Sequence, residues 1–286
     1  MDAAAGARPM CSVCGVRPAV FYRRFSGHRL CSRCMRTSLE RGVKRSLRGS
    51  NVFRPGVSIL VYPSATSPPS SLAFARLVGL VERSYGGRVY TVLPSYFSAR
   101  QGLNLLKDVV ELVEPPPPVE RAAGRLEDEV WAPRLLRLER GLASVSAELL
   151  GVDAAVLPVS RTVISMAGLE ALISSRLHYM WDLDVAEAGG GRPVVLGLRS
   201  VEAELIAGYA ALESFDATSR VRPKYVYKHV YKALVTDDKP ELEFSSSSTI
   251  SLLARASKIS GCKCRACGAP VPCGSKYCED CHTIWV

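Results

Sequence analysis

The chain has 286 residues, a formal net charge of +10 and 48% hydrophobic residues. This length accommodates one sizeable core with small appendages. No uninterrupted apolar run reaches the ~18–20 residues that span a membrane, and no apolar signal segment follows Met1, so we expect a cytoplasmic protein without a membrane partner. The charge is uneven: residues 1–54 hold 12 Lys/Arg against two acidic residues, whereas residues 55–286 are balanced.

The first element is a cysteine quartet, Cys11-x2-Cys14 followed by Cys31-x2-Cys34. Each pair offers two thiolates at one metal-sized opening, so the spacing favours a structural zinc ion. Iron–sulfur ligation, a disulfide and a redox pair are the alternatives. The redox alternative lacks the preceding strand of a βαβ unit. A helix over 38–47 is expected to leave this module.

The basic module also carries aromatic residues, Phe21, Tyr22 and Phe25, among its arginines. A basic metal knuckle with interleaved aromatics is typical of a surface for a polyanion, most simply RNA. The alternative is a solvated basic face that confers solubility. The candidate RNA-binding residues here are Arg23, Arg24 and Arg29.

The middle of the chain, from Met35 to Gly261, contains no cysteine and alternates apolar runs with helical patterns. This alternation predicts an α/β fold with a Rossmann-like parallel sheet and crossover helices. The expected strands are 57–62, 88–93, 154–158 and 193–198. The expected helices are 70–85, 101–113, 119–150 with a break at Pro133, 164–178 and 202–212. Pro115–Pro118 is expected to be a stiff polyproline stop.

The turn after the first strand is where a nucleotide-binding α/β domain holds phosphate. Here it reads Pro63-Ser-Ala-Thr-Ser-Pro-Pro-Ser-Ser71, without Gly, Lys or Asp. Its three prolines remove three potential N–H donors. We therefore do not expect ATP as a ligand.

A second basic and aromatic stretch, about 219–240, follows the last predicted crossover. If it is helical, Lys224, Lys228 and Lys232 recur every four residues on one face that could meet a phosphate backbone. A solvated helix face is the alternative. A serine cluster, 245–248, is expected to be a turn or cap before a helix over 250–257.

The chain ends in a second quartet, Cys264-x2-Cys267 and Cys278-x2-Cys281. It predicts a second structural zinc, so two per chain, with the same iron–sulfur alternative. Cys262 and Cys273 are left over and are interpreted as spare thiols. We expect three units: a basic four-cysteine zinc finger at 1–54, an α/β domain at 55–261 and a four-cysteine zinc finger at 262–286.

In this arrangement the chain resembles the TtuA-type and wobble-uridine tRNA 2-thiolation proteins, which carry a zinc finger at each end of a PP-loop ATP pyrophosphatase domain. The resemblance covers nearly the whole length. It rests on the two quartets, on Gly268-x-Pro270 and on the strand, loop and helix at 57–81. Further matching segments are Glu148–Asp153, Arg192-Pro193, Leu198–Glu202, Ile206 and Tyr209-Ala210.

Three departures from that family concern its chemistry. An SGGKDS-like loop is replaced by Pro63–Ser71. The family's sulfur-handling cysteines would fall near Trp131 and Arg134 and within 213–220, where there is none. Its second ATP motif, of the form GHNLDD, would fall at Pro158–Thr162 and is lost.

The departures make the chain similar to the non-catalytic second subunit of the eukaryotic and archaeal thiolation complex. The resemblance then implies a pseudoenzyme that supports 2-thiolation of uridine in tRNA, with tRNA and a catalytic PP-loop paralogue as partners. One alternative is an ATP-dependent tRNA sulfurtransferase that is active by itself through unfamiliar residues. Another is a zinc-finger RNA-binding scaffold unrelated to thiolation.

Overall fold

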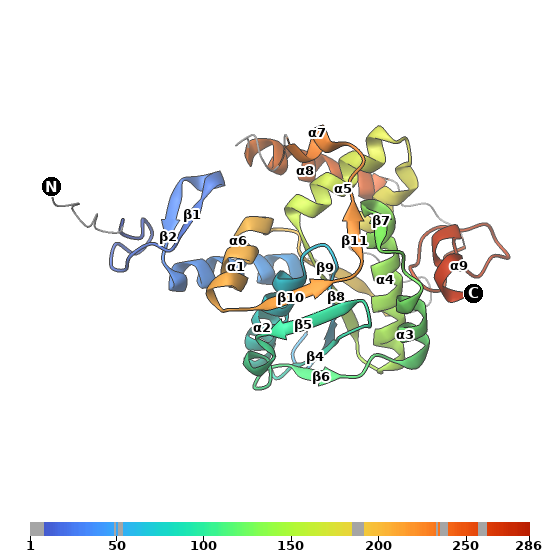
Figure 1. The fold of residues 1–286 in the computed structure, drawn as a ribbon, viewed down its shortest axis with the longest axis horizontal. Coiled ribbons are helices and arrows are strands. Elements are labelled where there is room, and N and C mark those ends of the chain that lie inside the picture. The colour runs from blue at the N-terminus through green and yellow to red at the C-terminus, as the bar shows by residue number, and fades with distance from the viewer. Residues whose placement is uncertain are drawn as a thin grey trace.

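A five-stranded parallel sheet forms the centre of the computed structural model, which describes residues 9–48, 50, 54–184, 192–232, 234, 240–256 and 262–286 (Figure 1). The strand order is β6-β4-β3-β8-β9. The strands are β3 (Ser58–Val61), β4 (Arg88–Val92), β6 (Glu111–Val113), β8 (Ala154–Ser160) and β9 (Val194–Leu198). All seven residues of β8 are buried, as expected for a strand covered on both faces by helices.

The chain fills one half of this sheet before it starts the other. From β3 it moves to β4 and β6 on one side, and later returns to β8 and β9 on the other. The strand order therefore reverses between β3 and β8. In open α/β sheets the ligand crevice lies at this place, beyond the carboxyl ends of the two strands.

Helices cover the sheet and supply the crossovers. They are α2 (Pro68–Arg83), α4 (Ala132–Leu149), α5 (Arg161–Ile173) and α6 (Ala203–Leu212). Helix α2 approaches the sheet closely at Gly197, where an added Cβ would stand 2.2 Å from the ring of Phe74.

Two cysteine-containing modules flank this core at opposite ends of the molecule (Figure 1). The N-terminal one is a hairpin, β1 (Phe21–Arg23) and β2 (His28–Leu30) with a short turn η1 (Arg24–Ser26), followed by α1 (Ser32–Arg48). Helix α1 contacts α6 and β9. The C-terminal module ends in α9 (Glu279–Trp285), which contacts α4.

The remaining elements are short and lie around the sheet. Strand β5 (Phe97–Gln101) pairs antiparallel with β10 (Asp216–Ser219), and β7 (Glu129–Trp131) pairs parallel with β11 (Arg222–Lys224). The other helical segments are η2 (Leu103–Leu105), α3 (Pro117–Gly124), η3 (Leu177–Leu183), α7 (Lys228–Tyr231) and α8 (Pro240–Ala256). Helix α8 packs on α5.

The predicted α/β architecture is confirmed, with four expected strands and the helices over α2 and α6 in place. The helix predicted at 101–113 is wrong. Its residues end β5, form η2 and then β6, because Gly102 has a left-handed φ of 92° and stops any helix at that point. The apolar residues Leu106 and Val110 of this segment are nevertheless buried in the core, which they reach from a turn and not from a helix.

Other boundaries also differ from the prediction. The expected polyproline stop opens α3, and the expected helix over 119–150 is divided by β7, after which Pro133 lies in the first turn of α4. The helix expected over 164–178 runs from Arg161 to Ile173. The serines 245–248 lie inside α8, where the Ser245 hydroxyl donates to the Glu241 carbonyl. No helix in the described part of the chain is long and apolar enough to cross a membrane.

Candidate metal centres and the crevice of the sheet

The N-terminal quartet is assembled from a tight turn and a helix start. The N–H of Gly15, with a left-handed φ of 66°, donates to the Cys11 carbonyl at 2.8 Å and closes the first knuckle. Cys31 directly precedes α1 and Cys34 lies in its first turn. Burial raises the pKa of Cys11, but backbone N–H groups of Cys14 and Cys31 outweigh it and lower that pKa to about 6. The backbone of this knuckle therefore favours a thiolate at Cys11, the form that binds metal.

The C-terminal quartet repeats this local structure. The N–H of Gly268, with φ 75°, donates to the Cys264 carbonyl at 2.9 Å. Cys278 caps α9, its sulfur accepting from the N–H of Cys281 at 3.5 Å. In each module the second pair therefore lies at a helix N-terminus, whose partial positive charge favours thiolates.

The sulfur positions fit one metal ion per quartet. All four Sγ atoms of each quartet lie within 4.8 Å of one another. The Cys14 and Cys31 sulfurs are 3.9 Å apart, and those of Cys267 and Cys278 are 3.7 Å apart. Four sulfurs bound at ~2.3 Å to a tetrahedral ion stand about 3.8 Å apart. A [4Fe-4S] cluster binds each thiolate to a different iron and needs them further apart.

Buried charges surround the C-terminal quartet. Arg137 pairs with Asp182 at 2.7 Å and with Asp280 at 3.4 Å, and it lies over the Tyr179 ring. Arg140 lies over the ring of Trp181, which packs on the quartet. These cations partly offset the negative charge of a four-thiolate site.

The structure corrects the interpretation of Cys262 and Cys273 as spare thiols. They form a disulfide, with Cα atoms 5.2 Å apart. The bond spans the first knuckle of the C-terminal quartet, because Cys264 and Cys267 lie between the two bonded residues. The Val271 N–H also donates to the Cys262 carbonyl at 2.9 Å, so the same loop is closed by its backbone.

The crevice beyond β3 contains a carboxylate of the chain itself. Glu139, fully buried on α4, accepts from the N–H of Ala65 at 2.6 Å and from the hydroxyl of Ser64 at 2.7 Å. These are donors of the turn that would face phosphate in an active enzyme. Burial raises the pKa of Glu139 to about 7, although both hydrogen bonds lower it. The turn is further fixed by the Ser64 N–H, which donates to the Ser71 hydroxyl at 3.1 Å.

An ion-pair network occupies the carboxyl end of β8 and the start of α5. Arg161 donates to Glu202 at 2.8 Å and to Glu243 of α8 at 3.1 Å. Glu202 also accepts from Arg23 of the N-terminal hairpin at 2.8 Å. Burial raises the pKa of Glu202, but Arg161 and Arg23 outweigh it and lower that pKa.

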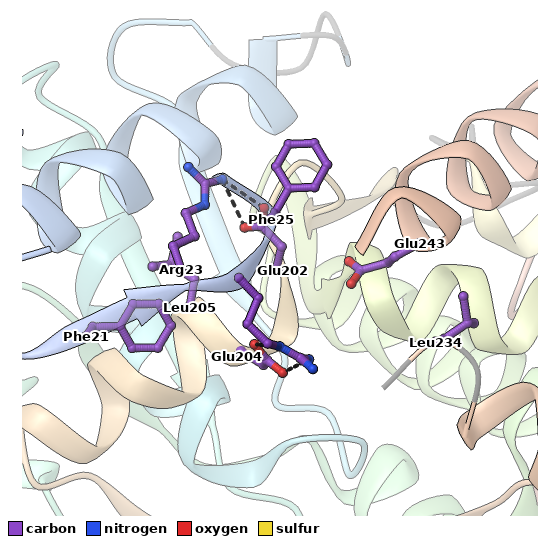
Figure 2. Close-up of a pocket in the computed structure, with 9 residues that line it drawn as sticks. Phe21, Arg23, Phe25, Glu202, Glu204, Leu205, Leu234 and Glu243 are labelled. Atoms are coloured by element: carbon purple, nitrogen blue, oxygen red, sulfur yellow. Dashed lines mark hydrogen bonds and ion pairs between the residues drawn. The ribbon is translucent and has the colours of Figure 1, made fainter. Parts of the chain in front are cut away.

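Figure 2 shows how this network holds the N-terminal module. Arg23 reaches Glu202 at the start of α6. Arg24 pairs with Glu204, in the first turn of the same helix. Glu243 enters the same pocket from α8. The space left between these side chains is about 20 Å³, which holds no more than a water molecule.

Trp131 and Arg134, at positions where the sequence analysis noted the lack of a cysteine, make structural contacts. The Trp131 indole N–H donates to Glu170 at 2.8 Å, and Arg134 pairs with Asp280 at 3.1 Å. The stretch 213–220 forms β10 and its flanks.

The structure places the candidate RNA-binding residues on several different elements. Arg23 and Arg24 are held by the glutamates of α6, whereas Arg29 is exposed on β2. Lys224 ends strand β11 and Lys228 opens the short helix α7, so the expected shared helical face is wrong. Lys224 and Lys232 are exposed. Part of the 219–240 stretch, residues 233 and 235–239, lies outside the described residues.

Sequence reasoning missed Glu139, Arg161 and Glu202. Glu139 had a detectable signal, since it interrupts the apolar stripe of Leu135, Leu138 and Leu142 on a helix. Arg161 and Glu202 had none, because their pairing joins residues 41 positions apart.

A solved structure shares the fold of this chain. No protein-family model matches the chain, and no curated protein matches it by sequence. Among solved structures, it is similar to the U34-tRNA thiolase NcsA from Methanococcus maripaludis, a structure with a [4Fe-4S] cluster. The TM-score is 0.69 over 96% of this chain and 95% of that chain, at 12% sequence identity. At this identity the similarity establishes a shared fold.

Proposed function

We propose that this protein is a non-catalytic subunit that supports 2-thiolation of uridine in tRNA in the cytoplasm. It binds tRNA together with a catalytic PP-loop paralogue, which supplies the ATP and sulfur chemistry. The similarity to a tRNA thiolase supports the thiolation role. The observation that carries the non-catalytic role is the Glu139 carboxylate on Ala65 and Ser64.

The phosphate turn is unsuited to a triphosphate for two reasons. A carboxylate already accepts from its donors, and an anionic phosphate brought to the same place would meet it at close range in a desolvated site. The helix behind it also lacks donors, because Pro68 and Pro69 occupy the first positions of α2 and have no N–H. ATP is therefore not expected to bind.

The rest of the crevice supports the same interpretation. Arg161, which stands in the segment of the second ATP motif, is engaged by Glu202 and Glu243. Trp131 and Arg134 provide no nucleophile for sulfur. The fold retains its architecture while its reaction site is closed by internal contacts.

Two zinc ions per chain are the cofactors that we propose. The donor sets are four cysteines at sulfur separations suited to one tetrahedral ion. When bound, such ions would hold the knuckles in place. The residues that would hold them are Cys11, Cys14, Cys31 and Cys34, and Cys264, Cys267, Cys278 and Cys281.

For tRNA, we propose direct phosphate contacts from Arg29, Lys224, Lys228 and Lys232. Arg23 and Arg24 act in RNA binding chiefly by fixing the orientation of the basic module on α6. Exposed Tyr22, beside Arg29 across the hairpin, adds a surface for stacking of a base.

The experiment is affinity purification of the full chain from its native cells. A cysteine-containing PP-loop protein is expected in the purified complex, together with tRNA. The complex, but not the isolated chain, should thiolate tRNA with ATP and a sulfur donor. Thiolation by the isolated chain would show an enzyme active by itself, and recovery of unrelated RNA proteins alone would favour a general scaffold.

A further inference from the structure

A second pocket lies near the amino end of strand β3, whereas the crevice lies beyond the carboxyl ends of the strands. It is formed by the last turns of α1 and α2 and by Arg54-Pro55, which lead into β3. Its volume is about 210 Å³. This is below the ~300–1,000 Å³ of pockets that enclose a whole drug-sized ligand, so it admits one flat ring system.

A buried carboxylate lies at the base of this pocket. Glu82, on α2, is 5% exposed, and no hydrogen bond or ion pair of its carboxylate is found within the described residues. The absence of a side chain at Gly87 makes room for it, since an added Cβ would stand 3.0 Å from Glu82 Oε2. The Lys44 ammonium attracts this carboxylate without forming an ion pair with it, so the hydrogen bonds of the carboxylate are left for a ligand with N–H donors.

The walls are apolar and the rim is cationic. Leu47 and Val81 line the pocket, and Tyr85, 47% exposed, offers its ring. The cations are Lys44, which lies 5.9 Å from the Tyr85 ring centre, exposed Arg48, and Arg54, which is 3.6 Å from Asp153.

The charge balance narrows the class of ligand. The three cations outnumber the Glu82 carboxylate and the neighbouring Asp153 by one, which disfavours a cationic ligand and favours an anion. The ligand therefore combines a flat body with N–H donors and an anionic group that remains at the rim. A nucleotide has these parts in this order, with its base inside and its phosphate outside.

We propose that this pocket binds a guanine nucleotide. Guanine presents two adjacent N–H donors, N1–H and the N2 amino group, which match the two oxygens of Glu82. Adenine and cytosine present an amino group next to a ring acceptor, and uracil presents one N–H between two carbonyls that would repel a carboxylate. The phosphate meets Arg48 and Arg54, and the base stacks on Tyr85.

The nucleotide has two chemical sources, a free guanine mononucleotide or a guanosine extruded from RNA. The proposal does not depend on the thiolation role, because the pocket lies away from the crevice and uses none of its residues.

The test is titration of the full chain with GMP, AMP and UMP at low salt, followed by calorimetry. GMP is expected to bind roughly tenfold tighter than UMP, the discrimination of one bidentate base contact. Glu82→Gln should reduce this preference to about twofold, because its amide replaces one acceptor by a donor. Arg48→Ala should weaken all three nucleotides about equally, whereas Arg45→Ala, an exposed change on the same helix, should alter none.

Competition with tRNA distinguishes the two sources. Displacement of GMP by tRNA, with tRNA affinity lowered by Glu82→Gln, assigns the site to an extruded guanosine. GMP binding that tRNA leaves unchanged assigns it to the free nucleotide. The proposal is overturned if GMP does not saturate the wild-type chain, or if the three nucleotides bind equally. If Glu82→Gln does not fold, the Arg48→Ala titration and the base preference of the wild type still test whether the pocket binds a guanine nucleotide.

Discussion

Glu139 Oε1 accepts a hydrogen bond from the backbone N–H of Ala65 at 2.6 Å, in the turn where a nucleotide-activating enzyme of this fold would hold phosphate. The carboxylate comes from α4, 74 residues further along the chain, and is fully buried. The turn is therefore satisfied by an internal carboxyl group. This one contact orders a glycine-free turn, and under the proposed function it is also expected to disfavour a triphosphate there.

The raised pKa of Glu139, about 7 against 4.5, predicts a pH dependence of stability. Between these two values the folded chain binds more protons than the unfolded chain, so the free energy of unfolding falls as pH rises from about 4.5 to 7 and is then flat. The contribution is on the order of 3 kcal/mol. Glu139→Gln should remove this slope in urea titrations across that range. Glu148→Gln, exposed on the same helix, should retain it, and an unchanged slope in Glu139→Gln would contradict the assignment.

Metal content is predicted to be two zinc ions per chain, with neither iron nor inorganic sulfide. Cys31→Ser and Cys281→Ser should each lose one ion by elemental analysis, because each removes one of four ligands. Cys273→Ser is the control and should keep two ions, since Cys273 belongs to the disulfide. Iron and sulfide in about fourfold ratio to a quartet would instead establish an iron–sulfur cluster.

Loss of the Glu202 charge should destabilise the fold far more than loss of the Glu204 charge. Glu202→Gln weakens two ion pairs, to Arg161 and Arg23, and leaves buried Arg161 partly uncompensated, at a cost of about 3 kcal/mol. Glu204→Gln affects only an exposed pair with Arg24 and should cost under about 1 kcal/mol. Urea unfolding measures both. Equal effects would mean that the network does not hold the N-terminal module.

The disulfide should stabilise the C-terminal module alone. It closes a loop with a sequence separation of 11, and such a loop restricts the unfolded chain by about 3 kcal/mol. In the double variant Cys262→Ser, Cys273→Ser, a chelator should remove the C-terminal ion faster while the N-terminal ion leaves at the wild-type rate. Reduced wild type should behave like the variant, and identical release rates in all three would refute a role for this bond.

Arg29→Glu should weaken tRNA binding about tenfold and reduce the salt dependence by about one phosphate contact. Arg29 is exposed on the basic hairpin, away from the ion pairs of α6. The control is Arg88→Glu, the same change of charge at the exposed first residue of β4, which should have little effect. Equal weakening by both variants in filter binding would indicate attraction to net charge rather than a defined surface.

Much of the fold could be predicted from local sequence. The central strands are short apolar runs between turn residues, so β3, β8 and β9 could be predicted as buried strands. The metal quartets could be predicted from spacing alone. Strands β5 and β7 could not, because three to five residues gain strand geometry only by pairing with β10 and β11, about 90 to 120 positions later.

For the candidate site, the sequence predicted mainly which groups are absent. The turn at Pro63–Ser71 indicated the loss of phosphate donors, but Glu139 as the group that replaces phosphate depended on the packing of α4 against β3. Arg23 shows that local sequence can also suggest a role that distant contacts change. Its surroundings in sequence are those of an RNA-binding arginine, while its partner Glu202 lies 179 residues away and has no local signature.

Binding of ATP and magnesium to the isolated full-length chain tests the central claim most directly. Calorimetry should detect no ATP binding of micromolar affinity, and any weaker binding should be displaced by GMP, because it belongs to the Glu82 pocket. The complex with the catalytic partner should bind ATP through that partner. Micromolar affinity for ATP in the isolated chain, followed by adenylation of tRNA, would contradict the account.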